Sequence, residues 1–131
     1  MIVFLYGRDS YRLRQSLDGI IGEYKKKYSG LAFSVLDLSQ ADEFTRLDNV
    51  IKTVSFFDEK RLVVINNAFN EGEKVANLIK TWDLNSDKHR ILVFAENTDE
   101  TQLIKKDRAL FALLSAKPNM VKFFEPLTGS K

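Results

Sequence analysis

The residues best placed to do chemistry follow the first apolar run and read Gly7-Arg8-Asp9-Ser10. A glycine between a strand and a helix can hold a phosphate through backbone N–H groups and the helix N-terminus. A working phosphate loop needs several glycines, followed by Lys and then Ser or Thr. This turn has one glycine and no Gly-Lys-Ser/Thr, and the dinucleotide pattern of three spaced glycines is also missing. The turn therefore lacks the groups that bind or hydrolyse a nucleotide.

Other groups that act in catalysis or metal binding stand apart from one another in the sequence. The third apolar run ends in Asn66-Asn67 rather than in an acidic pair that could hold Mg²⁺, and Asp9 stands alone, which disfavours a phospho-acceptor domain. The single histidine, His89, precedes Arg90, and an isolated histidine of this kind favours a structural role. Cysteine is absent, which excludes disulfides and thiolate metal sites. We therefore expect no catalytic residue, no metal and no cofactor.

The strongest signal for binding a partner is the adjacent pair Phe56 and Phe57, which the charged run Asp58-Glu59-Lys60-Arg61 follows at once. Neighbouring side chains cannot share one face of a helix or strand, so one Phe should point away from the core. If the preceding helix continues this far, its phase puts Phe57 on the apolar stripe and Phe56 opposite. If the helix ends at Thr53 or Val54, both can lie on an exposed turn. An exposed aromatic anchor is typical of protein–protein hot spots, although the pair can instead seal the core.

The elements that must position these residues alternate between strands and helices. Apolar runs predict strands at 2–6, 31–38, 61–65, 91–95 and 120–124. Apolar residues at helical spacing predict helices over 13–28, 44–54, 75–82 and 103–114, the last with a break near Lys106. Strands joined by helical crossovers lie parallel, with helices on both faces. We expect an α/β protein, a three-layer α/β/α domain with a five-stranded, mainly parallel sheet.

The length, the net charge and the apolar runs of the chain limit the functions that it can have. The 131 residues are enough for one domain, and the net charge of +2 is too small to indicate non-specific nucleic-acid binding. The basic residues Arg8, Arg12, Arg14 and Lys25 to Lys27 are better explained as solvated helix faces than as phosphate contacts. No run of 18 or more apolar residues predicts a membrane span.

Three segments carry a resemblance to a known family. Residues 4–11 form an opening strand with a glycine, an acid and a helix start; residues 53–65 join a helix to the Phe pair, a charged turn and a strand; residues 123–127 form an exit segment. Together they resemble the N-terminal domain of the bacterial DNA polymerase III delta subunit, a clamp-loader component. The likeness covers essentially the whole chain, and the middle segment is its most specific part.

The resemblance implies an AAA+ fold, related to P-loop NTPases, that lacks a functional phosphate loop. It implies that the Phe pair is a plug that enters a hydrophobic pocket on the β sliding clamp and helps to open the ring for loading on DNA. The site residues are then Val54, Ser55, Phe56, Phe57 and Asp58. The chain would be a cytoplasmic, non-catalytic part of a DNA-directed DNA polymerase holoenzyme, with ATP hydrolysed by sister subunits and DNA contacted only indirectly.

Family members are longer and continue into a lid domain and a collar domain that join the loader pentamer. We therefore expect a clamp-binding domain at residues 1–125 and the start of a linker at 126–131, with the gamma/tau and delta prime subunits bound through domains that this chain lacks. Alone it should be a monomer that binds no membrane. Two alternatives stay open at this stage. One is a nucleotide or small-molecule domain that uses the first strand–helix turn, and the other is an interaction scaffold with another partner.

Overall fold

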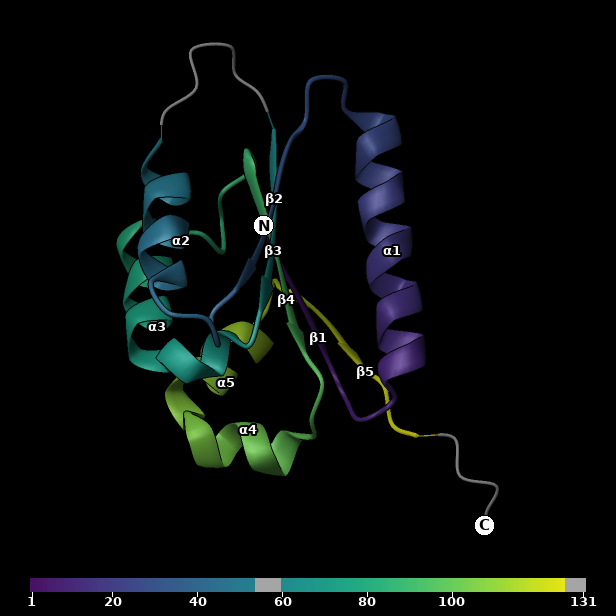
Figure 1. Ribbon diagram of the computed structural model, residues 1–131, viewed down its shortest axis with the longest axis vertical. Coiled ribbons are helices and arrows are strands. Elements are labelled where there is room, and N and C mark those ends of the chain that lie inside the picture. Colours follow the sequence, from purple (N-terminus) through teal and green to yellow (C-terminus); the bar gives the residue numbers. More distant parts are fainter. Residues whose placement is uncertain (54–59, 127–131) are drawn as a thin grey trace.

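A computed structural model describes residues 1–53 and 60–126 of the chain (Figure 1). Strands and helices alternate, as the apolar runs predict. The elements in chain order are β1 (Ile2–Tyr6), α1 (Ser10–Lys27), β2 (Ala32–Asp37), α2 (Glu43–Lys52), β3 (Arg61–Asn66), the 3₁₀ helix η1 (Ala68–Glu71), α3 (Gly72–Thr81), β4 (Arg90–Glu96), α4 (Glu100–Lys106), α5 (Arg108–Ser115) and β5 (Met120–Phe123).

The strands form one sheet in the order β2-β3-β4-β1-β5, and all four neighbouring pairs are parallel. The predicted five-stranded, mainly parallel sheet is confirmed. The central strands β1, β3 and β4 are buried almost throughout, which explains their continuous apolar runs. Because every strand runs the same way, the connections gather at two edges, an amino edge where strands begin and a carboxyl edge where they end.

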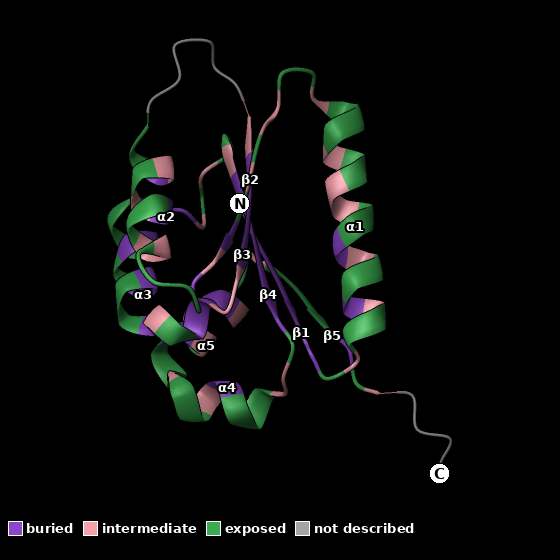
Figure 2. Ribbon diagram, in the orientation of Figure 1, coloured by how far each residue is buried: buried purple, intermediate pink, exposed green. Residues whose placement is uncertain are grey.

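Helices cover both faces of the sheet, but unequally (Figures 1 and 2). Helix α1 packs on one face through Leu13 and Leu17, against β1 residues such as Val3 and Leu5. Helices α2, α3, α4 and α5 cover the other face, where alternate β1 residues such as Phe4 join the larger of the two core clusters. The three layers are therefore one helix, the sheet and four helices.

Local sequence signals explain most element boundaries. Asp9 is the N-cap of α1, and its side chain accepts a hydrogen bond from the Arg12 N–H at 3.1 Å. The predicted break near Lys106 is confirmed, because Asp107 ends α4 and caps α5 by accepting from the Leu110 N–H at 2.9 Å. Most predicted bounds lie within a few residues of the observed ones, but the 3₁₀ helix η1 has no predicted counterpart, and α2 ends at Lys52 rather than at residue 54.

Candidate protein-binding site

The predicted site residues lie outside the described residues: Val54, Ser55, Phe56, Phe57 and Asp58. Their exposure therefore remains a prediction. What the structure does fix is the scaffold on each side of them, the end of α2 before them and the start of β3 after them (Figure 1).

Helix α2 ends one residue before Thr53. The backbone of Thr53 is extended, with φ −66° and ψ 127°, and its N–H donates to the Asn49 carbonyl at 3.0 Å. The Thr53 hydroxyl donates to the same carbonyl at 2.7 Å, which closes the last turn. The helical phase that separates Phe57 from Phe56 therefore cannot be carried through Thr53. The second sequence alternative, a helix that ends here, is the one that the structure matches.

The start of β3 is held on two sides. The Arg61 guanidinium donates from Nη1 to the Val50 carbonyl at 3.1 Å and so ties the strand to the last turns of α2. The Arg61 N–H donates to the His89 carbonyl at 2.8 Å, and Lys60 Nζ donates to the Lys88 carbonyl at 2.6 Å. The described residues on either side of 54–59 are thus held by hydrogen bonds, and β3 begins at the amino edge of the sheet.

The first strand–helix turn, at the carboxyl edge, is already occupied by the chain itself. The Gly7 N–H donates to the Glu96 carbonyl at 3.2 Å, and the Asp9 N–H donates to the Phe124 carbonyl at 3.1 Å. A Cβ on Gly7, where φ is +142°, would lie 2.1 Å from the same Phe124 oxygen. Two backbone donors that a phosphate could use, the N–H groups of Gly7 and Asp9, are therefore already engaged, and Phe124 fills the space beside Gly7.

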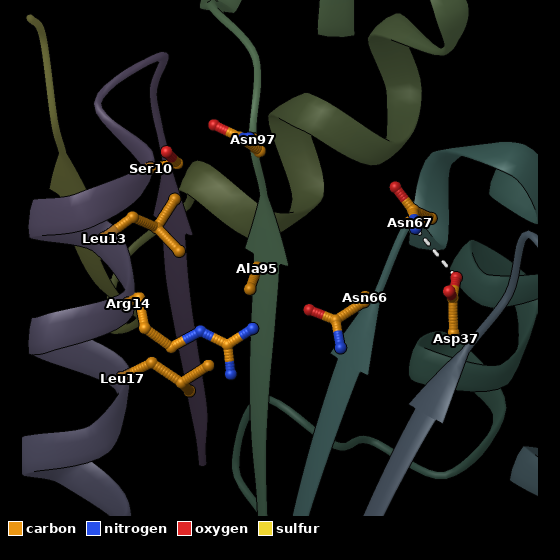
Figure 3. A pocket seen from close by; sticks show the side chains of 9 residues that line it. All are labelled: Ser10, Leu13, Arg14, Leu17, Asp37, Asn66, Asn67, Ala95 and Asn97. Carbon is orange, nitrogen blue, oxygen red and sulfur yellow. Dashed lines mark hydrogen bonds between the residues drawn. The ribbon is translucent and has the colours of Figure 1, made fainter.

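A cavity that sequence reasoning missed lies beside this turn, between α1 and the carboxyl ends of the sheet (Figure 3). Its volume is about 310 Å³, and its lining comprises Ser10, Leu13, Arg14, Leu17, Asp37, Asn66, Asn67, Ala95 and Asn97. The Arg14 side chain extends into it from α1. The one available signal was that asparagines follow both β3 and β4, at one edge of the sheet.

This cavity offers hydrogen-bonding groups rather than a catalytic set. The Asn67 amide donates to Asp37 Oδ1 at 2.7 Å, and Ser39 also donates to that oxygen. Hydrogen bonds from Asn67 and Ser39 lower the pKa of Asp37 below its ordinary value of 3.8. Asp37 is thus committed as an ionised acceptor, and no histidine, cysteine or lysine is among the lining residues that could activate Ser10.

Asp87 and Asp99 accept hydrogen bonds from backbone N–H groups. Asp87 accepts from the N–H groups of His89 and Arg90, and Asp99 caps α4 by accepting from the Gln102 N–H at 2.9 Å. Across residues 1–53 and 60–126, no group of three or more His, Cys, Asp or Glu residues is arranged to hold a metal ion. No helix in those ranges is long and apolar enough to cross a membrane.

Two arginines at the carboxyl edge form ion pairs at the surface. Arg8 pairs with Asp99 and Arg12 pairs with Asp9, each with a nitrogen–oxygen distance of 3.8 Å. These two belong to neutralised surface pairs, which agrees with the reading that they are solvated.

Two comparisons with known proteins bear on the family and on the fold of this chain. Residues 4–124 match the family described as "DNA polymerase III, delta subunit". Among solved structures, the chain is similar to the DNA clamp loader delta protein of Bacillus subtilis, with 20% identity and a TM-score of 0.66, over 96% of this chain. The chain spans 38% of the length of that protein. No curated protein matches.

Proposed function

Since the chain belongs to the DNA polymerase III delta subunit family, we propose that it binds the β sliding clamp through Phe56 and Phe57 and helps to open the ring. Val54, Ser55 and Asp58 complete the proposed contact. The observation that supports the proposal is that the described residues on each side of this aromatic pair are held, Thr53 by the last turn of α2 and Arg61 by its contact with Val50. Anchoring both ends lowers the entropy that a binding segment loses when it docks.

The proposed mechanism is differential binding. A contact shifts the clamp towards an open ring only if it favours the open interface over the closed one. The domain needs no chemistry of its own for this, which agrees with the occupied donors of the Gly7 turn. In the proposal, ATP is bound and hydrolysed by sister subunits of the loader.

The proposal also includes the domain bounds and the other subunits of the clamp loader. Residues 1–125 form the clamp-binding domain, and residues 126–131 begin a linker to further domains. Through those domains the delta subunit would join the gamma/tau and delta prime subunits in the cytoplasm, with DNA contacted only indirectly. The 38% share of the Bacillus subtilis protein that this chain spans supports this division.

The direct test is titration of a purified bacterial β sliding clamp with this chain, followed by biolayer interferometry or calorimetry. Saturable binding is expected. Failure to bind at concentrations up to about 100 μM, a free energy weaker than about 5.5 kcal/mol, would contradict the proposal. Capture of a different protein from a bacterial lysate, without the clamp, would favour the scaffold alternative.

We expect millimolar ATP or ADP, with or without Mg²⁺, to leave the melting temperature of this chain within about 1 °C of its value without ligand. The reason is that the Gly7 and Asp9 N–H groups already donate to Glu96 and Phe124. A ligand at 100 times its dissociation constant stabilises the native state by about 2.7 kcal/mol, which thermal unfolding detects easily. A shift of several degrees would overturn this expectation and revive the nucleotide-binding alternative. GTP at the same concentration separates specific binding from a general effect of polyphosphate.

A further inference from the structure

A row of lysines borders the proposed docking segment. We call it the lysine ridge; it consists of Lys25, Lys26 and Lys27 in the last turn of α1, and Lys60 at the start of β3. The two parts are joined through Tyr28, because Lys27 Nζ and Lys60 Nζ each lie 5.4 Å from the centre of its ring. The ridge therefore ends at the residue that follows 54–59.

Aromatic rings contact three of the four ridge lysines, Lys25, Lys27 and Lys60. Lys25 Nζ lies 4.5 Å from the centre of the Phe33 ring on β2. The Tyr28 ring stacks on Tyr24, with centroids 5.8 Å apart and planes 13° from parallel. A cation over a ring face is attracted to it by about 0.5–1 kcal/mol at an exposed site. The ammonium groups of Lys25, Lys27 and Lys60 thus have preferred positions.

The ridge lysines form no ion pair with any residue in the described part of the chain. Other basic residues do: Arg46 pairs with Glu43, Lys52 with Asp48 and Lys74 with Glu71. Lys60 donates to the Lys88 carbonyl, and the carboxylate of the preceding residue, Asp87, is already paired with Arg90 at 2.5 Å. Within the described residues no carboxylate pairs with these four cations, so they repel one another, and an acidic surface would relieve that repulsion.

We propose that the lysine ridge docks on an acidic surface of the same partner that receives Phe56 and Phe57. This rests on the proposed function and adds to it a second, electrostatic contact. The ridge is continuous with the start of β3, which follows the proposed docking segment. The Ala32 N–H donates to the Lys60 carbonyl at 3.0 Å, so β2, the ridge and the start of β3 form one edge. A partner seated on the Phe pair would meet this edge.

Single-stranded nucleic acid is the competing occupant, because basic grooves with aromatic rings bind it by stacking. Two observations favour a protein. The rings of Phe33 and Tyr28 already hold ammonium groups over a face, which leaves less ring surface for bases. The ridge also contains only lysine, whereas arginine is the residue that binds phosphate bidentately and stacks on bases.

The test compares two variants with equal loss of charge. Lys25→Gln/Lys27→Gln removes two ridge cations, and Lys105→Gln/Arg108→Gln removes two exposed cations at the opposite edge of the molecule. Each is titrated against a purified bacterial β sliding clamp at about 50 mM and about 500 mM salt, with association and dissociation rates measured. The ridge variant should bind about 5- to 10-fold more weakly at low salt, mainly through slower association. The difference should shrink at high salt, and the control should stay within about 2-fold.

The outcomes separate this inference from the proposed function. Clamp binding that is lost in a Phe56→Ala/Phe57→Ala variant but unchanged in the ridge variant would overturn the ridge while the proposed function stands. No binding by the unmodified chain would overturn both. Binding of a labelled oligo(dT) that the ridge variant loses, with clamp affinity intact, would assign the ridge to nucleic acid instead. Thermal unfolding of each variant verifies that these exposed substitutions leave the fold intact.

Discussion

Replacing Phe56 and Phe57 together by alanine should weaken binding to a bacterial β sliding clamp by at least about 30-fold, or about 2 kcal/mol. Buried aromatic anchors at the centre of an interface commonly contribute this much, because they fill a desolvated pocket. The loss should appear mainly as faster dissociation, in contrast to the slower association expected for the lysine ridge. Surface-plasmon or biolayer measurements at several salt concentrations distinguish the two.

The scaffold gives this experiment a clear control. Contacts made outside residues 54–59, such as Arg61 to Val50 and Thr53 to Asn49, hold the neighbouring elements, so we expect the double variant to stay folded. Tyr11→Ala, which removes a ring that is 76% exposed on α1, is the matched change of an exposed aromatic elsewhere. The assignment of the plug fails if a folded Phe56→Ala/Phe57→Ala variant keeps the affinity of the Tyr11→Ala variant. The single variants Phe56→Ala and Phe57→Ala then show which ring contributes more to the affinity. Because α2 ends at Lys52, its helical phase does not distinguish the two residues.

The fold follows from the sequence because its signals are local and strong. Buried strands such as β4 read as unbroken apolar runs, and the Asp107 cap marks the break between α4 and α5. The 3₁₀ helix η1 escaped prediction because four residues are too few for a periodic pattern. Its start depends on a distant residue, since the Ala68 N–H donates to the Glu96 carboxylate.

Sites assembled from several elements were harder to find. The cavity beside α1 needs the ends of β2, β3 and β4 to come together, which no single stretch of sequence reports. Lys25 to Lys27 are interpreted from the sequence as part of a solvated helix face, and the structure places them in the last turn of α1. That Lys60 joins them over the Tyr28 ring depends on the tertiary fold. The Phe pair was visible in the sequence because two adjacent rings conflict with the period of a helix or a strand.

Glu96 should make the stability of this domain depend on pH in the neutral range. The side chain is 3% exposed, and its Oε2 accepts from the Ala68 N–H at 2.7 Å. Burial raises the pKa of the Glu96 carboxyl from 4.5 to about 7, against the hydrogen bond from Ala68 and the positive charge of Lys106, both of which favour the ionised form. Burial is the larger effect because an ionised carboxylate loses most of its hydration there.

The direction of this pH dependence follows from whether the native or the unfolded state holds the proton. Between pH 4.5 and about 7 the native state keeps a proton that the unfolded chain has lost, so protonation favours folding. This contribution is fully present below pH 4.5 and is lost as the pH rises through about 7. The difference between the two pKa values corresponds to about 3 kcal/mol. Stability from this group should therefore fall between about pH 5 and pH 8, and acidification should restore it.

Glu96→Gln tests this, because glutamine keeps an oxygen that can accept from the Ala68 N–H but carries no charge to bury. Urea unfolding at pH 5, 6, 7 and 8 should show the variant gaining up to about 3 kcal/mol relative to the unmodified chain as the pH rises. Taking the difference between the two proteins cancels the contributions of other titrating groups, including the N-terminus, whose pKa burial lowers. Glu73→Gln, an exposed change on α3, should follow the unmodified chain at every pH. Parallel curves for Glu96→Gln and the unmodified chain would show that Glu96 stays ionised across this range, with the Ala68 and Lys106 interactions outweighing its burial.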